Sequence, residues 1–346
     1  MKKKIVTFGE IMLRMTRPGK ERIIQGSKWN GYFGGSEANV AVSLAMFGDN
    51  IEYVTRLPNN KIGMACMDEI RKYNVGVDNI EWGGDRLGLY YYEESASMRS
   101  SNIVYDREDS SLTTLKAGMI NWKKAFQGAG MFHWSGISSA LSQGAADATR
   151  EAVDEAEKEG LVISCDINHR ANLWRYGKDA HDVLFPMAEK SDIMFGTAGE
   201  WKLITGITPP EFKAVSADYE IDKAAYEDYF RKAGKILPKA KKMILVLRNT
   251  LSANHHLLSG VIFAEGKLYT TRIYDIDNVV DPMGVGDAFI AAYLHAYTTW
   301  GDDNQHCLEF SLASSALKNT IQGDFNLFTE EEVEDIMKGN YEENIG

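Results

Sequence analysis

Cysteine is scarce in this chain, and long apolar runs are missing from its sequence. Cys66, Cys165 and Cys307 lie far apart, so no paired spacing suggests a disulfide framework or a zinc site. No stretch approaches the roughly 18 apolar residues of a membrane span, and the apolar run after the N-terminal lysines is too short for a secretory signal. These absences favour a soluble, cytoplasmic protein that does not bind a membrane.

Positive charge is also in deficit. The chain has 38 lysine and arginine residues against 49 aspartate and glutamate residues, which gives a net charge of -11. This balance argues against a surface built for nucleic acid or anionic lipid. An anionic small molecule would therefore have to be held by local basic groups or helix ends. The 346 residues are enough for one large α/β domain or two smaller ones.

Short apolar segments alternate with amphipathic ones along most of the chain. We expect strands at residues 4–8, 51–54, 75–80, 161–165 and 243–247, and helices at 62–73, 145–159, 221–235 and 307–320, the last followed by an acidic tail. The alternation predicts an α/β fold with a central, mostly parallel sheet flanked by helices. We assign residues 1–11, 33–85 and 116–346 to this core.

Two segments, 12–32 and 86–115, interrupt the alternation. The second holds two aromatic and β-branched runs that are typical of antiparallel strands, so we expect the two segments to form a small β-sheet lid. Its tyrosines, Tyr90, Tyr91, Tyr92 and Tyr105, would lie on both faces. One face could then cover a ligand and the other contact a partner subunit. For Tyr91 and Tyr92 we favour simple filling of the sheet.

A glycine-rich turn, Gly284-Val285-Gly286-Asp287, precedes a segment with helical apolar spacing. Glycines permit a tight turn and a close approach of backbone amides to a ligand, and a helix N-terminus favours an anion. A carboxylate beside such a site could accept the proton of a hydroxyl that attacks a phosphate. The alternative is that Asp287 is only an N-cap and the glycines only a turn.

A second glycine pair, Gly34 and Gly35, opens another helix that carries Asn39. Paired glycines at a helix start permit close approach of a ligand, and the Asn39 amide offers both a donor and an acceptor. Tight packing of helix and sheet, with Asn39 capping locally, explains the same residues equally well.

A polar run, Asp166 to Arg170, directly follows the strand expected at 161–165. At strand period, Asp166, Asn168 and Arg170 would share one side at the carboxyl end of the sheet, where open α/β sheets bind ligands. Such a set could orient hydroxyls and pair with a carboxylate or a phosphate. The alternative is a surface salt bridge between Asp166 and Arg170.

In this order, the three motifs resemble the ribokinase-like (PfkB) carbohydrate kinase family, over almost the whole chain. The elements around Gly34, Tyr90, Tyr105 and Arg107, together with the run that ends at Arg170, look more narrowly like those of 2-keto-3-deoxygluconate kinases. The resemblance implies a ribokinase-like fold and transfer of the ATP γ-phosphate to a hydroxyl of a sugar acid. It implies ATP and Mg2+ as cofactors, with a monovalent cation as a further candidate.

Carried over to this sequence, the resemblance implies a role for each motif. Asp287 would be the base, and the amides of Gly284, Val285, Gly286 and Asp287 would stabilise the transferring phosphoryl group. The sugar would be bound by Gly34, Gly35, Asn39 and Asn168 from the core and by Tyr90, Tyr105 and Arg107 from the lid, with Arg170 pairing with its carboxylate. The nucleotide would be bound by Arg248 and by the turn glycines Gly284 and Gly286. Glu200 would bind magnesium through water. Two arginines in a sugar site suit an acid sugar better than a neutral one.

The sequence departs from the family pattern at three places. Pro282 and Val285 alter the usual turn, Thr197 replaces an asparagine three residues before Glu200, and residues 248–254 lack the usual glycines. A fructokinase or ribokinase acting on a neutral sugar is therefore an alternative, as is a non-catalytic ligand-binding protein on the kinase fold. An exposed aromatic lid further suggests a homodimer formed through it.

Overall fold

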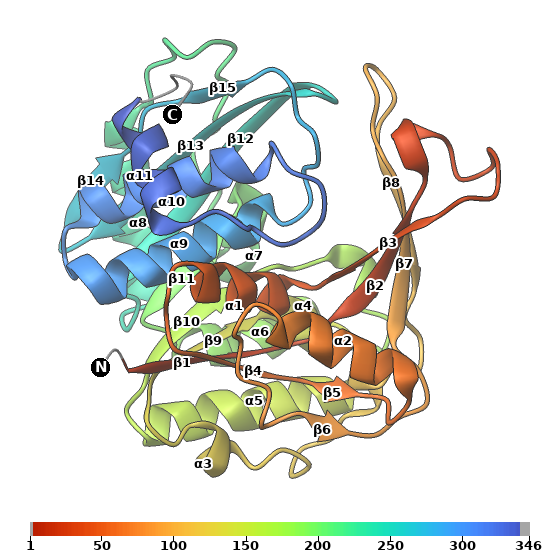
Figure 1. Ribbon diagram of the computed structural model, residues 1–346. Coiled ribbons are helices and arrows are strands. Elements are labelled where there is room, and N and C mark those ends of the chain that lie inside the picture. The colour runs from red at the N-terminus through yellow and green to blue at the C-terminus, as the bar shows by residue number, and fades with distance from the viewer. Residues whose placement is uncertain (1–2, 340–346) are drawn as a thin grey trace.

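The computed structural model describes residues 3–339. They form one large sheet covered by helices on both faces and a small sheet that projects from one side (Figure 1). The expected α/β class is therefore confirmed, and so is the separation of a small sheet from the main one.

The main sheet has nine strands. These are β1 (Lys4–Phe8), β4 (Ile51–Val54), β9 (Ala129–Ser135), β10 (Val162–Asp166), β11 (Ile193–Gly196), β12 (Lys242–Ser252), β13 (His255–Ala264), β14 (Lys267–Thr270) and β15 (Tyr274–Ile276). Their order is β14-β13-β12-β11-β10-β9-β1-β4, with β15 beside β13. The pairs from β4 to β12 are parallel, and β13 pairs antiparallel with its neighbours. All the parallel carboxyl ends therefore meet at one edge, which is where the site residues lie.

Two apolar cores, one on each face, hold the helices to this sheet. Neighbouring residues of β1 alternate between them, with Ile5 in the first core and Val6 in the second. The first core includes residues of α1 (Ser36–Met46), α2 (Lys61–Arg71), α9 (Val285–Trp300), α10 (Asn304–Lys318) and α11 (Glu330–Lys338). The second includes residues of α3 (Trp122–Ala125), α5 (Gln143–Lys158), α6 (Ala180–Ala188), α7 (Ala198–Thr205) and α8 (Lys223–Ile236). Within residues 3–339, no helix is both long and apolar enough to span a membrane.

The small sheet has the order β3-β2-β7-β8, from β2 (Met12–Thr16), β3 (Asn30–Gly34), β7 (Gly88–Glu93) and β8 (Asn102–Asp106). Burial alternates along β2 and β7, so one face is buried and the other half-exposed. The register places four large side chains in one row of the buried face: Tyr32, Arg14, Tyr90 and Tyr105. The sheet therefore presents Tyr32, Tyr90 and Tyr105 to the main domain on one face, whereas Tyr91 lies on the other.

Three sequence-based expectations are wrong. Residues 75–80 form no strand; they make a single bridge, between Gly76 and Glu52, because a glycine and a turn leave too few residues to continue the pairing. The tail after α10 is not featureless, since Thr329 caps the additional helix α11 through a capping box with Glu332. Strand periodicity also stops at Asp166, because Asn168 and Arg170 both adopt positive φ, at 36° and 44°.

Candidate active site

Asp287 lies in the first turn of α9 and bonds to another helix rather than to its own helix start. Its two carboxylate oxygens accept hydrogen bonds from Ser36 Oγ at 2.8 Å and from Asn39 Nδ2 at 2.7 Å. The N-cap of α9 is Gly284, so the interpretation of Asp287 as a mere N-cap is wrong. The geometry instead joins the turn before α9 to the glycine pair before α1, 248 residues away in sequence.

Both glycines before α1 are required by close packing. A Cβ at Gly34 would collide with the Asp324 carboxylate, and one at Gly35 would collide with the backbone carbonyl of Glu10. The Gly35 amide donates to Asn39 Oδ1 at 3.2 Å. The two interpretations of this stretch are therefore compatible: Asn39 caps locally with its carbonyl and uses its amide for Asp287.

The turn 284–287 presents free backbone donors. Within the described residues, the amides of Val285, Gly286 and Asp287 donate no hydrogen bond, as expected at a helix N-terminus. Gly284 has a left-handed φ of 76°, and the space beside Gly286 is open. The Val285 side chain packs into the core. Val285 therefore leaves the amides of the turn available for an anion.

The segment after β10 approaches the same place. Asn168 Nδ2 donates to Ser36 Oγ at 3.2 Å, and Ser36 in turn donates to Asp287. The exposed Arg170 lies close enough to act electrostatically on both Asp166 and Asp287. Although the expected strand geometry fails here, Asn168 is linked to Asp287 through Ser36, and Arg170 acts on Asp287 electrostatically.

Burial dominates the ionisation of the carboxyl groups in this region. It raises the pKa of Asp287 above its usual value, while the hydrogen bonds from Asn39 and Ser36 act in the opposite direction. It raises the pKa of Asp166 well above its usual value, and the nearby charge of Glu200 adds to the shift. Glu37, which accepts a hydrogen bond from Ser135 Oγ at 2.6 Å, has its pKa raised by burial to about 7. Displaced carboxyl pKa values of this kind are typical of acid–base sites.

The residues expected from the small sheet are already held by neighbours. The Tyr90 hydroxyl donates to Asp324 Oδ1 at 2.7 Å. The Arg107 guanidinium is buried against Glu10, with Nε at 2.9 Å from Glu10 Oε2, and it lies over the Tyr105 ring. Its Nη1 atom is buried without a hydrogen-bond partner among the described residues. Arg107 therefore keeps one donor group for a ligand.

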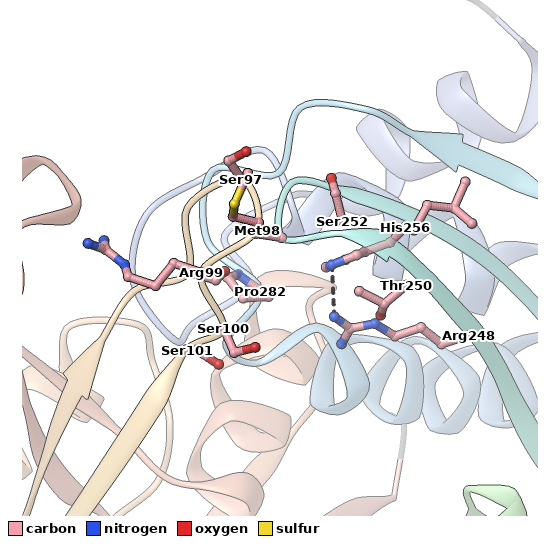
Figure 2. Close-up of a pocket in the computed structure, with 13 residues that line it drawn as sticks. Ser97, Met98, Arg99, Ser100, Ser101, Arg248, Thr250, Ser252, His256 and Pro282 are labelled. Atoms are coloured by element: carbon pink, nitrogen blue, oxygen red, sulfur yellow. Dashed lines mark hydrogen bonds between the residues drawn. The ribbon is translucent and has the colours of Figure 1, made fainter.

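A polar cavity of about 550 Å³ lies between the tip of the β7–β8 hairpin and β12. Figure 2 shows Arg248 and His256 on one wall, opposite Ser97, Met98 and Ser100. Arg248 Nη2 lies 2.9 Å from His256 Nε2. Arg99 also lines the cavity, but its guanidinium points away toward the Lys20 and Glu94 carbonyls. Pro282, two residues before Gly284, also borders the cavity.

Glu200 has a structural role at the start of α7. Its Oε2 accepts hydrogen bonds from Thr197 N and Thr197 Oγ1, both at 2.8 Å, in a capping box. Its Oε1 accepts a hydrogen bond from the His169 amide at 3.1 Å. No group of three histidine, cysteine or carboxylate side chains within residues 3–339 has the arrangement of a metal site.

Comparison with known proteins matches residues 2–326 to the model of the pfkB family of carbohydrate kinases. The chain belongs to this family. It is 28% identical to the 2-dehydro-3-deoxygalactonokinase of Haloferax volcanii, over 98% of both chains. The crystal structure of 2-dehydro-3-deoxygluconokinase from Thermotoga maritima is 35% identical, with a TM-score of 0.90 over 98% of this chain and 99% of that one. A fructokinase from Xylella fastidiosa with bound ATP shares the fold at 19% identity, with a TM-score of 0.78 over 99% of this chain and all of that one.

The predicted ribokinase-like fold and kinase activity are thereby confirmed, and the non-catalytic alternative is wrong. The residues of this kinase also fit ATP and magnesium. Free amides at the N-terminus of α9 and the Arg248 side chain suit phosphates. Mg2+ usually keeps several waters and binds through phosphates and one or two carboxylates, so the lack of a three-residue ligand group within residues 3–339 does not conflict with such an ion.

Three polar residues of this kinase site were missed in the sequence: Ser36, Glu10 and Asp324. Ser36 joins Asp287 to Asn168, Glu10 holds Arg107, and Asp324 holds Tyr90. Ser36 could have been found, because it follows the glycine pair directly. Glu10 and Asp324 had no signal, since each is an isolated acidic residue whose partner is distant in sequence.

Proposed function

We propose that this kinase phosphorylates 2-keto-3-deoxygluconate at its 6-hydroxyl with ATP. The observation that supports a sugar-acid substrate is the presence of two arginines at the site. Arg170 acts electrostatically on Asp287, and Arg107, held by the Glu10 residue that packs against Gly35, keeps a free Nη1. A guanidinium can donate charge-assisted hydrogen bonds to a carboxylate, whereas a neutral hexose offers no charged partner. The two sugar-acid kinases similar to this chain act on related 2-dehydro-3-deoxy acids, so the galactonate epimer is the competing substrate.

The reaction follows from the site geometry. The sugar hydroxyl lies at the Asp287 carboxylate, which takes its proton as the hydroxyl oxygen attacks the γ-phosphorus. A bond forms between that oxygen and phosphorus, and the bond from phosphorus to the β,γ-bridging oxygen breaks, with its electron pair leaving on ADP. The amides of Val285, Gly286 and Asp287 donate to the transferring phosphoryl oxygens.

The ligands divide between the two sides of the site. The small sheet acts as a lid: Tyr90, Tyr105 and Arg107 enclose the sugar, while Gly34, Gly35, Asn39 and Asn168 bind it from the core. ATP lies along the cavity of Arg248 and His256. Glu200 would hold magnesium through water, together with the phosphates, and the ion would supply charge neutralisation. The monovalent cation stays a prediction, as does the cytoplasmic location, which the three free cysteines favour.

A panel of acceptors tests the proposal. Wild-type kinase is assayed by coupled ADP release with 2-keto-3-deoxygluconate, its galactonate epimer, fructose and ribose. We expect the highest kcat/KM with 2-keto-3-deoxygluconate, and nuclear magnetic resonance of the product should place the phosphate on O6. Arg170→Ala and Arg107→Ala should each raise KM for the acid sugar far more than for a neutral one. Equal effects on acid and neutral sugars would contradict the carboxylate assignment.

We also propose a homodimer formed through the outer face of the small sheet. Several residues that share this face by register are apolar and half-exposed or exposed: Met15, Leu89, Tyr91 and Val104. Leu13 and Phe33 lie on the same face but pack in part against the first core, and Asp106, opposite Leu89, is a charged member of it. Exposed apolar side chains gathered on one face are typical of a protein interface. A second copy of the same sheet would cover it symmetrically.

A further inference from the structure

Arg14 is a buried lid residue outside the sets assigned to sugar, nucleotide and phosphate. It stands on β2 between Tyr32 and Tyr90, and its side chain has 0% exposure. Its guanidinium points to the core, where Nη1 and Nη2 donate to the two oxygens of Asp281 at 3.1 Å and 2.6 Å. A bidentate pair of this kind fixes both distance and direction.

Asp281 shapes the turn that carries the phosphate donors. Its Oδ1 accepts the Met283 amide at 3.0 Å, and its Oδ2 accepts the Gly323 amide at 3.0 Å. Met283 in turn packs against the small-sheet cluster of Met12, Tyr90 and Tyr92. One carboxylate therefore sets the backbone path into Gly284 and ties it to the segment after α10.

Asp324 also packs against this turn, at Gly284. Arg14 Nε lies 3.2 Å from Asp324 Oδ2, in an ion pair that lacks the alignment of a hydrogen bond. The Asp324 carbonyl lies where a Cβ of Gly284 would be, and its carboxylate lies where a Cβ of Gly34 would be. Any shift of Asp324 is consequently transmitted to both glycine motifs of the site.

Charge explains why a guanidinium is needed here. Asp281 and Asp324 are two buried carboxylates whose negative charges repel each other. Arg14 donates to Asp281 and forms an ion pair with Asp324, and the Tyr32 and Tyr92 ring centroids lie 4.8 Å and 5.6 Å from its guanidinium carbon. Lys318, also buried, adds a second positive charge nearby.

We propose that Arg14 is a positioning residue for phosphoryl transfer. It holds Asp281 and Asp324 together, and through them it keeps the turn 281–287 in register with the sugar-binding row of the lid. Arg14 acts through the turn and contacts neither the sugar nor the phosphate. The inference rests on the proposed role of the turn amides and is independent of which sugar is the acceptor.

Arg14→Ala tests the proposal, with Arg17→Ala as the matched control. Arg17 is an equally buried lid arginine, but it pairs with Glu21, the Lys28 carbonyl and the Trp29 ring, away from the turn. A misplacement of about 1 Å can cost about 10²-fold in rate. We expect Arg14→Ala to lower kcat by about that factor with small changes in both KM values, and Arg17→Ala to retain kcat.

Guanidinium chloride at millimolar concentration provides a second readout. It should restore part of the kcat of Arg14→Ala saturably, because the ion can occupy the space between the two carboxylates, and it should not stimulate Arg17→Ala or wild type. Urea at the same concentration should have no effect. Wild-type kcat in Arg14→Ala, or a loss that guanidinium does not reverse, overturns the proposal.

Arg14→Lys covers the case in which the alanine variant does not fold. Lysine keeps the charge but cannot form the bidentate pair, so we expect a folded protein with kcat lowered about tenfold or more; wild-type kcat would overturn the proposal. If wild type phosphorylates another sugar but no sugar acid, the proposed substrate is wrong, and the same comparison is made with the accepted sugar.

Discussion

Replacement of Asp287 by asparagine separates proton transfer from the architecture of the site. The Asp287 oxygens accept from Ser36 Oγ and Asn39 Nδ2. In the variant, the asparagine carbonyl can still accept from Asn39, and its amide can donate to the Ser36 hydroxyl, which can also act as an acceptor. The bond between the turn and α1 is therefore kept, and only the base is lost.

The expected loss follows from what remains. A positioned general base contributes about 10²- to 10⁴-fold, or roughly 3 to 5 kcal/mol at about 1.4 kcal/mol per decade. The variant leaves unchanged the free amides of Val285 and Gly286 and the lid arginines. Stabilisation of the charge on the phosphoryl group and binding of both substrates should therefore persist. We expect kcat of Asp287→Asn to fall by about 10³-fold, with KM for both substrates within about threefold of wild type.

The pH profile and the stability of Asp287→Asn provide independent checks. Burial raises the pKa of Asp287, so wild-type kcat/KM should fall as pH decreases through that raised value, and the variant should lack this acid limb. The Asp287 carboxyl binds its proton more tightly in the folded state than in the unfolded state. Its ionisation therefore destabilises the fold at pH values above the raised pKa of the folded state. At pH values below the pKa of the unfolded state the group is protonated in both states, and this destabilisation is absent. The variant should therefore melt no lower than wild type at pH 7.

The coupled ADP assay, with phosphate incorporation measured by mass spectrometry, gives kcat directly. Circular dichroism and a thermal melt establish that the variant is folded. An Asp287→Asn protein that melts like wild type and retains more than about a tenth of its kcat would refute the assignment of Asp287 as the base.

Three further predictions concern the ligands and the subunit contact. Arg248→Ala should raise KM for ATP about tenfold with KM for the sugar unchanged; an altered sugar KM alone would contradict the nucleotide assignment. Glu200→Gln should raise the Mg2+ concentration for half-maximal rate severalfold, measured at fixed ATP, since its capping bonds survive in part; an unchanged requirement would remove Glu200 from the magnesium site. Val104→Lys should convert a dimer to a monomer in analytical ultracentrifugation, whereas Val215→Lys, at a more exposed valine outside the small sheet, should not; a Val104→Lys dimer would exclude this face.

The fold was predictable where local pattern and tertiary context agree. The strands at 4–8 and 51–54 have the expected bounds, because each is a short apolar run between turn residues. The strand Ala129–Ser135 had no such signal, since its glycine, histidine and tryptophan do not form a conventional apolar run. This segment forms a strand because both of its faces are buried. That burial depends on the neighbouring strands and helices, which the local sequence does not show.

The site was predictable in its motifs and not in their partners. The glycine pairs and Asp287 are visible because backbone approach and helix starts require particular residues in sequence. The ionic partners of the lid residues cannot be identified from the sequence. Glu10 and Arg107, for example, are 97 residues apart, and the sequence around each has the composition of an ordinary surface segment. Sequence reasoning therefore assigned Arg107 to the ligand with its whole charge, whereas the structure leaves it one free donor group beside a neutralising carboxylate.

That neutralisation changes how the two arginines should divide the recognition of an acid sugar. Arg107 is paired with Glu10 and held over the Tyr105 ring. It can therefore orient the sugar carboxylate, although the pair with Glu10 carries little net charge. Arg170 is exposed and acts on Asp166 and Asp287 only through space, so it can supply electrostatic attraction that salt can screen. The KM increase in Arg170→Ala should thus shrink as ionic strength rises, and that in Arg107→Ala should persist. A loss in Arg107→Ala that disappears in high salt would show that Glu10 does not neutralise it.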